Sequence, residues 1–139
     1  MNTNPYSVYK IQNKKQAESV AESVAYFFEL AANHMKEAGQ CIERNDIVKL
    51  VEETQKAQEI LGSLAENLQP TDPEIGDVAE KLYHYYSTMM ILMSRMVIKR
   101  DITICAAIEK SLRQMQSCWL TYGKKAEKEV LRTSAINDE

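Results

Sequence analysis

Apolar residues recur every three or four positions along most of this chain, which is the spacing of one face of an α-helix. Four segments carry this pattern, and short polar or proline-containing stretches separate them near residues 45, 71 and 100. Only three prolines and four glycines occur in 139 residues, so few positions interrupt a helix. No segment shows the alternation of a β-strand. The pattern predicts an all-α protein with four helices.

Residues that favour helix N-termini lie just before or within the start of each segment. Ser19 and Glu22 fit a capping box, which predicts that the first helix begins near Ser19. Asp46 and Asp101 are expected to cap the second and fourth helices. The third helix follows the break at 70–73, with its cap at Thr71 or Asp72.

The connections between these helices are only a few residues long, so successive helices are expected to be antiparallel neighbours. The predicted architecture is an antiparallel, up-down-up-down four-helix bundle over residues 17–126. Residues 1–16 form an extended N-terminal arm in this interpretation, and residues 127–139 form a charged C-terminal tail that frays. The fourth helix is expected to end at Gly123 or to be extended by residues 126–131.

The segment Leu82–Ile98 carries more apolar surface than one side of a helix can bury. One set of residues has the spacing expected for the bundle core: Leu82, Tyr85, Met89, Met93 and Met96. A second set has helical spacing but is expected to point elsewhere: Tyr83, Tyr86, Met90 and Val97. A helix that is apolar on two faces is central in a larger core or presents a surface to a partner.

Composition excludes several classes of function. The formal net charge of −3 gives no attraction to nucleic acid, and the short basic pairs lie among acidic residues. The longest apolar run, Met89–Met93, is far shorter than the roughly 20 residues that span a bilayer, so no membrane insertion is expected. The first residues lack the apolar stretch of a signal peptide, and the three cysteines form no C-x-x-C pair. These features predict a cytoplasmic protein with reduced thiols.

No pattern in the chain indicates chemistry. A di-iron site in a helix bundle needs two Glu-x-x-His pairs, but neither His34 nor His84 has a glutamate three residues before it. The glycines are scattered and form no phosphate-binding loop. The cysteines lie on or beside the predicted core stripes, where a thiol acts as a small apolar group. We therefore expect no metal, no cofactor and no catalytic site.

Several motifs, in order and at matching intervals from about Val20 to Leu120, resemble the FliS family, the flagellin-specific export chaperones of the bacterial flagellum. The stretches that carry the resemblance are the arm Asn4–Tyr9, the segment Ile47–Leu68, the segment Gly76–Tyr83, and Trp119 near the end of the fourth helix. The chain departs from the family pattern at Gln16–Ser19, at Phe27–Leu30, and at Ile91 and Leu92, where an arginine pair is usual.

The resemblance implies a small cytoplasmic chaperone without ATPase activity. Such a protein holds the C-terminal helical segment of newly made flagellin, prevents its polymerisation in the cell and delivers it to the flagellar type III export apparatus. Helix-in-groove binding needs apolar anchors at helical spacing, which Tyr83, Tyr86, Met90 and Val97 are expected to supply. Tyr6 and Tyr9 in the arm are expected to cover part of this surface in the free protein. The alternative is that the same apolar face serves self-association or assembly with another helical bundle.

Overall fold

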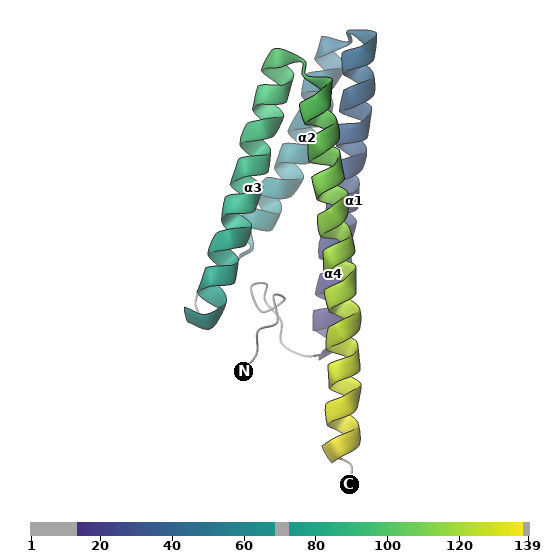
Figure 1. The fold of residues 1–139 in the computed structure, drawn as a ribbon, viewed down its shortest axis with the longest axis vertical. Coiled ribbons are helices and arrows are strands. Elements are labelled where there is room, and N and C mark those ends of the chain that lie inside the picture. Colours follow the sequence, from purple (N-terminus) through teal and green to yellow (C-terminus); the bar gives the residue numbers. More distant parts are fainter. Residues whose placement is uncertain (1–13, 69–72, 138–139) are drawn as a thin grey trace.

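The computed structural model describes the backbone of residues 14–68 and 73–137, and the side chains of residues 20–68 and 78–121. Four helices account for nearly all of these residues: α1 (Lys14–Arg44), α2 (Ile47–Glu66), α3 (Pro73–Lys99) and α4 (Ile102–Asn137). The helices run alternately up and down along one long axis (Figure 1). The predicted four-helix bundle is therefore confirmed, and no strand occurs within the described backbone.

Two predicted helix ends differ from the structure. Helix α1 begins at Lys14 rather than near Ser19, because the residues before Ser19 are themselves good helix formers and the helix continues through the expected cap. Helix α4 continues past Gly123 to Asn137, so most of the predicted frayed tail is helical backbone. The predicted arm and the end of the tail lie outside the described residues, at 1–13 and 138–139.

The α1–α2 and α3–α4 turns have the same construction and lie at the same end of the bundle (Figure 1). Asn45 and Arg100 take left-handed backbone conformations, with φ of 58° and 51°, and the residue after each donates its N–H to a carbonyl five positions earlier. Asp46 then accepts the N–H of Lys49 on α2, and Asp101 accepts those of Thr103 and Ile104 on α4. The predicted aspartate caps of α2 and α4 are confirmed.

Helix α1 forms the most extensive contacts in the bundle, first with α4 and then with α2. Its buried face is rich in alanine, which lets the neighbouring backbones approach closely: Ala21, Ala25, Ala31, Ala32 and Ala38. All four helices contribute large side chains that are fully buried: Phe28, Met35, Leu50, Leu61, Tyr86, Met93, Met96, Ile108 and Leu112. Cys41 and Cys105 are buried among them, as expected for thiols that fill space.

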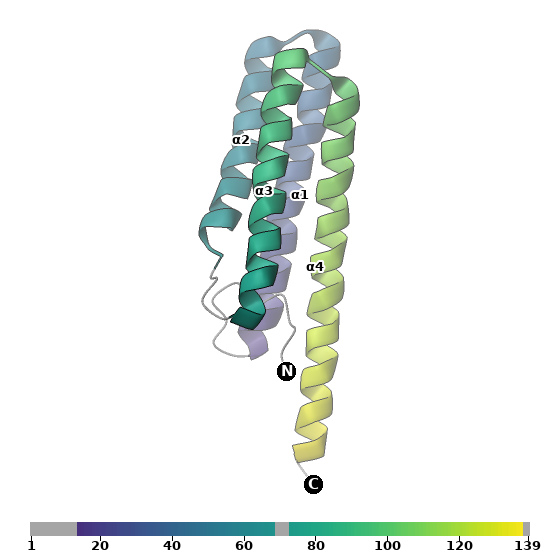
Figure 2. The same cartoon turned by 60° about the vertical axis from the view of Figure 1, so that its left-hand side comes forward.

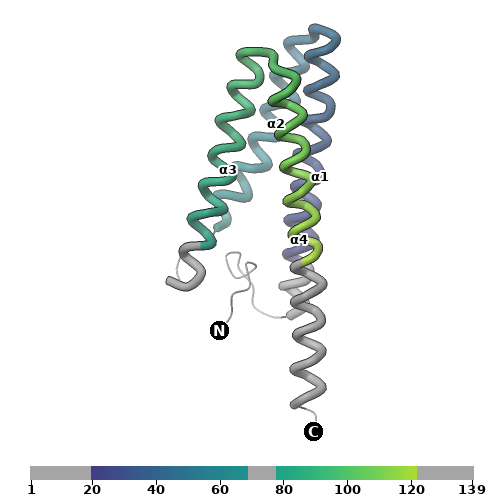
Figure 3. The backbone as a smooth tube through the Cα atoms, in the orientation of Figure 1, coloured from purple at the N-terminus to yellow at the C-terminus, as the bar shows by residue number. Residues whose placement is uncertain are grey.

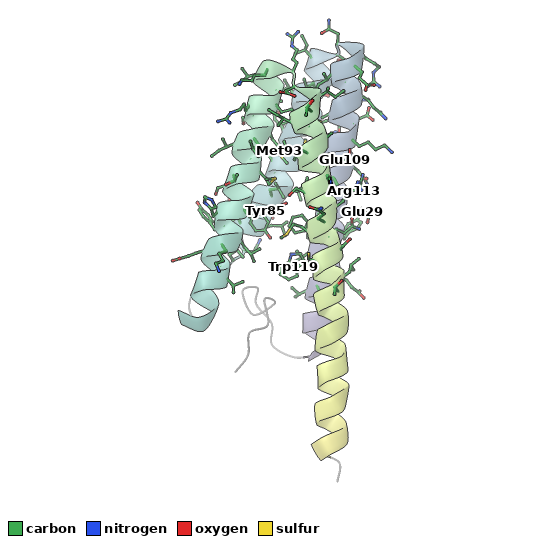
Figure 4. All side chains as sticks on the ribbon, viewed as in Figure 1. Glu29, Tyr85, Met93, Glu109, Arg113 and Trp119 are labelled. Atoms are coloured by element: carbon green, nitrogen blue, oxygen red, sulfur yellow. The ribbon has the colours of Figure 1, made fainter. Side chains whose placement is uncertain are left out.

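Helix α3 is held mainly by α2 and less closely by α4. Figure 1 and the tube in Figure 3 show the axes of α3 and α4 diverging from the turn that joins them. Large side chains occupy this side of the bundle, and Tyr85 on α3 lies 2.8 Å from Ser111 on α4, hydroxyl to hydroxyl (Figure 4). No helix in the described part of the chain combines the length and the apolarity needed to cross a membrane.

Candidate binding groove between α2 and α3

A shallow groove of ≈ 240 Å³ lies where the first half of α2 passes the second half of α3. The two helices lie side by side and antiparallel in both views (Figures 1 and 2). Seven side chains line the groove: Val51, Thr54, Gln55 and Gln58 from α2, and Ser94, Val97 and Ile98 from α3. The lining is a mixture of branched apolar and uncharged polar groups.

Exposed apolar side chains extend this surface beyond the groove itself. Ile98 is 81% exposed and Val48, one turn before Val51, is 72% exposed. Ile91, seven residues before Ile98 and therefore on nearly the same side of α3, is 59% exposed. An exposed apolar surface of this kind, on a helix pair with polar rims, is typical of a protein interaction site.

Gln58 forms a fixed polar point in the groove. Its amide nitrogen donates to the backbone carbonyl of Met90 at 3.0 Å and lies 2.9 Å from the hydroxyl oxygen of Ser94. A backbone carbonyl only accepts hydrogen bonds, so the amide orientation of Gln58 follows from this contact. One turn along α2, a Cβ on Gly62 would lie 4.0 Å from the sulfur of Met90, an ordinary van der Waals distance, so Met90 packs beside this position of α2.

The structure distributes the predicted binding residues over three environments. Tyr83 is 59% exposed, Val97 lines the groove, and Met90 is half-buried against α2. These three residues are spaced by seven along α3, and they lie on the side of that helix that faces α2 and solvent. Tyr6 and Tyr9 lie outside the described residues.

Tyr86 corrects the sequence interpretation of α3. It is fully buried, so it does not lie on the second, outward face where we expected it. The core positions of α3 are spaced by seven and then three residues, at Ala79, Tyr86, Met93 and Met96, whereas Tyr85 is only partly buried. A seven-residue register through Ala79 would have assigned Tyr86 to the core, but the larger residues beside it obscured this register.

Sequence reasoning missed several residues of the groove. Val48 and Val51 lie beside the buried stripe of α2 and form a second short apolar row, which the regular pattern of that stripe concealed. Ile98 lies at the end of α3, next to cations, and nothing in the pattern distinguishes it from a core residue. In the sequence, Ile91 stands out only because it replaces one residue of the arginine pair that is usual in the family. Gln58 belongs to the segment that resembles the family, but its hydrogen bonds could not be predicted, because its partners are the Met90 carbonyl and Ser94, 32 and 36 residues away.

A second polar contact, between α1 and α2, joins His34 to Glu53. Nδ1 of His34 lies 2.6 Å from Oε2 of the buried Glu53, and Lys56 lies 3.5 Å from the other oxygen. Burial works against ionisation of Glu53, but the hydrogen bond and charge of His34, with Lys56, outweigh it and lower the pKa of this carboxyl. The pair joins two helices and does not line the groove.

Two further hollows in the described surface do not suggest chemistry. One lies between α1 and α4, where Cys105 lies beside Gly39. Burial, followed by the charge of Glu109, raises the pKa of Cys105 to about 11. That thiol is a poor nucleophile. An open depression along α4 is bordered by the ion pair of Glu109 and Arg113, at 2.9 Å, and Arg113 also donates to Asn33 on α1 (Figure 4). The described residues contain no cluster of three or more metal-binding side chains.

Comparison with known proteins identifies the family. The model of the family described as flagellar protein FliS matches residues 2–126, which includes α1, α2, α3, most of α4 and both sides of the groove. No curated protein sequence matches the chain. A match over nearly the whole chain, on a four-helix bundle, agrees with the resemblance noted in the sequence. The chain belongs to the FliS family of flagellar chaperones.

Proposed function

We propose that this chaperone binds the C-terminal helical segment of newly made flagellin in the cytoplasm, prevents its premature polymerisation and aids its delivery to the flagellar export apparatus. The observation that carries the proposal is the apolar surface of the α2–α3 groove, with Val48, Ile91 and Ile98 exposed on its borders. The family assignment supports a chaperone role in flagellar export.

The groove and the apolar stripe of an amphipathic helix are complementary surfaces. A segment that polymerises through an amphipathic helix must have its apolar stripe covered until export, and a groove with anchors at helical spacing covers such a stripe. Ile91 and Ile98 supply anchors seven residues apart on α3, and Val48 and Val51 supply two more on α2. Binding of this kind involves no bond making, and we propose that the protein acts without enzymatic activity.

Tyr83, Met90 and Val97 remain in the proposed site, whereas Tyr86 does not. Tyr83 continues the exposed row of α3 toward its N-terminal end, and Val97 forms part of the groove wall. We retain the proposal that Tyr6 and Tyr9 cover the apolar surface in the free protein. Deleting residues 1–13 is then expected to increase the binding of a fluorescent apolar dye, and unchanged dye binding would contradict it.

Isothermal titration calorimetry with the purified chain and a synthetic C-terminal segment of the flagellin from the same cell tests the proposal. We expect a one-to-one complex, with a negative heat-capacity change because apolar surface is buried. No detectable heat and no co-elution of the two chains on a sizing column would refute the proposal. If the free chain has twice its monomer mass and the segment does not dissociate it, the groove serves self-association instead.

A further inference from the structure

The polar floor of the groove contains two side-chain oxygens that can accept hydrogen bonds from an occupant. Gln58 uses its amide nitrogen on the Met90 carbonyl and on Ser94, and Thr54 donates its hydroxyl hydrogen to the carbonyl of Leu50 at 2.8 Å. Both side chains line the groove, and both retain oxygen lone pairs that these contacts do not use. An occupant that donates hydrogen bonds can therefore use the oxygens of Gln58 and Thr54, while the Ser94 hydroxyl, which accepts from Gln58, keeps its own hydrogen.

The α2 border of the same groove carries two exposed glutamates, Glu52 and Glu59, with Lys56 between them in the sequence and paired with Glu53. Glu52 and Glu59 are exposed, and each lies three or four residues from Gln55, which places them next to the groove lining on the helix surface. Neither has an ion-pair partner among the residues that the structure describes, in contrast to Glu37 and Glu53. The opposite border, on α3, carries Arg95, which lies between Ile91 and Ile98, and Lys99 directly follows Ile98.

We propose that the groove takes an amphipathic helix that has lysine or arginine side chains along the edge facing α2, and that Glu52 and Glu59 select this edge. The apolar stripe of the helix covers Val51, Val97 and Ile98. Its cationic side chains pair with the two glutamates, and one such side chain that reaches the floor donates to the free oxygen of Gln58. Arg95 disfavours the reversed placement, because the basic edge would then face a cation. This inference rests on the proposed function and specifies the chemistry of the segment that the groove accepts.

Two synthetic peptides test the charge preference with the full-length chain. Both form the same amphipathic helix with the same leucines, and the residues flanking the apolar stripe on one edge are lysine in the first peptide and glutamine in the second. Fluorescence anisotropy gives the affinity of each peptide for the wild-type chain and for E52Q/E59Q. The matched control is E22Q/E29Q, which removes two exposed glutamates with the same spacing from α1 and causes the same change in net charge.

Two exposed ion pairs predict that the wild-type chain binds the lysine peptide about fivefold more tightly than the glutamine peptide at low salt. E52Q/E59Q is expected to abolish this preference, E22Q/E29Q to retain it, and added salt to reduce it. The inference would be overturned by equal affinity of the two peptides for the wild-type chain or by binding of neither peptide. An equal loss of the preference for the lysine peptide in both double variants would also overturn it.

The same chains are then titrated with the flagellin segment. If that segment binds the wild-type chain and E52Q/E59Q equally, the charge inference fails while the proposed function stands. If the lysine peptide shows the expected preference but the flagellin segment does not bind, the proposed function fails and the groove's preference for a basic helix stands.

Discussion

Phe28 on α1 and Tyr86 on α3 stack across the interior of the bundle, with ring centroids 5.9 Å apart and ring planes inclined by 29°. Both side chains are fully buried. The ring of Tyr85 meets that of Tyr86 edge-on at a centroid distance of 5.9 Å, so one aromatic cluster joins α1 to α3, two helices that share few direct contacts. The cluster fixes α3, the helix that supplies one side of the groove.

Replacing Tyr86 is therefore expected to affect stability before it affects binding. Tyr86→Ala removes a fully buried ring and leaves a cavity, which predicts a loss of about 3–5 kcal/mol in the free energy of unfolding. Urea unfolding followed by far-UV circular dichroism measures this loss. Tyr83→Ala is the matched control, because Tyr83 is on the same helix but 59% exposed, and it is expected to change stability by less than about 0.5 kcal/mol. Equal effects of the two substitutions would contradict the burial of Tyr86.

The contrast between these two tyrosines also shows what the sequence could and could not predict. The four helices, the aspartate caps and the antiparallel arrangement follow from the local spacing of apolar residues and from capping chemistry, and both can be read from the sequence. The direction in which each residue of α3 points cannot be predicted in this way, because apolar residues on both sides of that helix allow more than one register. The groove depends on how α2 and α3 meet, and Gln58 forms its hydrogen bonds with residues 32 and 36 positions away.

The contact between His34 and Glu53 predicts a pH dependence of stability. The pKa of Glu53 is lowered in the folded chain, so the folded state holds the carboxylate more strongly than the unfolded state does. The stabilisation is complete above the ordinary pKa of 4.5 and is lost as the pH falls through the lower, folded value. Glu53→Gln is expected to cost about 2 kcal/mol near pH 6, where the charge-assisted hydrogen bond is intact.

Urea unfolding at several pH values between about 3 and 6 tests this prediction. The difference in unfolding free energy between the wild-type chain and Glu53→Gln is expected to narrow as the pH falls below about 4.5. Glu29→Gln, at an exposed site on α1, is the control and is expected to show a small difference at every pH. If the difference in unfolding free energy between the wild-type chain and Glu53→Gln stays constant with pH, the contact of the Glu53 carboxylate with His34 does not stabilise the fold.

The three thiols are expected to react at very different rates with an aromatic disulfide reagent. Cys118 is exposed, whereas Cys41 and Cys105 are buried, and burial raises the pKa of both buried thiols. Only the thiolate attacks the reagent, so one equivalent is expected to react promptly in the native chain and the other two only on unfolding. Mass spectrometry of partly labelled protein identifies the site. Prompt labelling of Cys105 would show that the α1–α4 contact beside Gly39 opens readily.

Substitution of an exposed groove residue is expected to separate binding from folding. Ile98 is 81% exposed, so Ile98→Asp removes little buried apolar area and should leave the free energy of unfolding within about 0.5 kcal/mol of the wild-type value. In the proposed complex the client covers this position, where an unpaired carboxylate is costly, and we expect the affinity for the flagellin segment to fall at least about tenfold. Tyr26→Asp provides the control, because Tyr26 is 55% exposed on α1, away from α2 and α3. An equal loss of affinity in both variants would show that the client is not confined to the groove, and unchanged affinity in Ile98→Asp would remove the end of α3 from the binding surface.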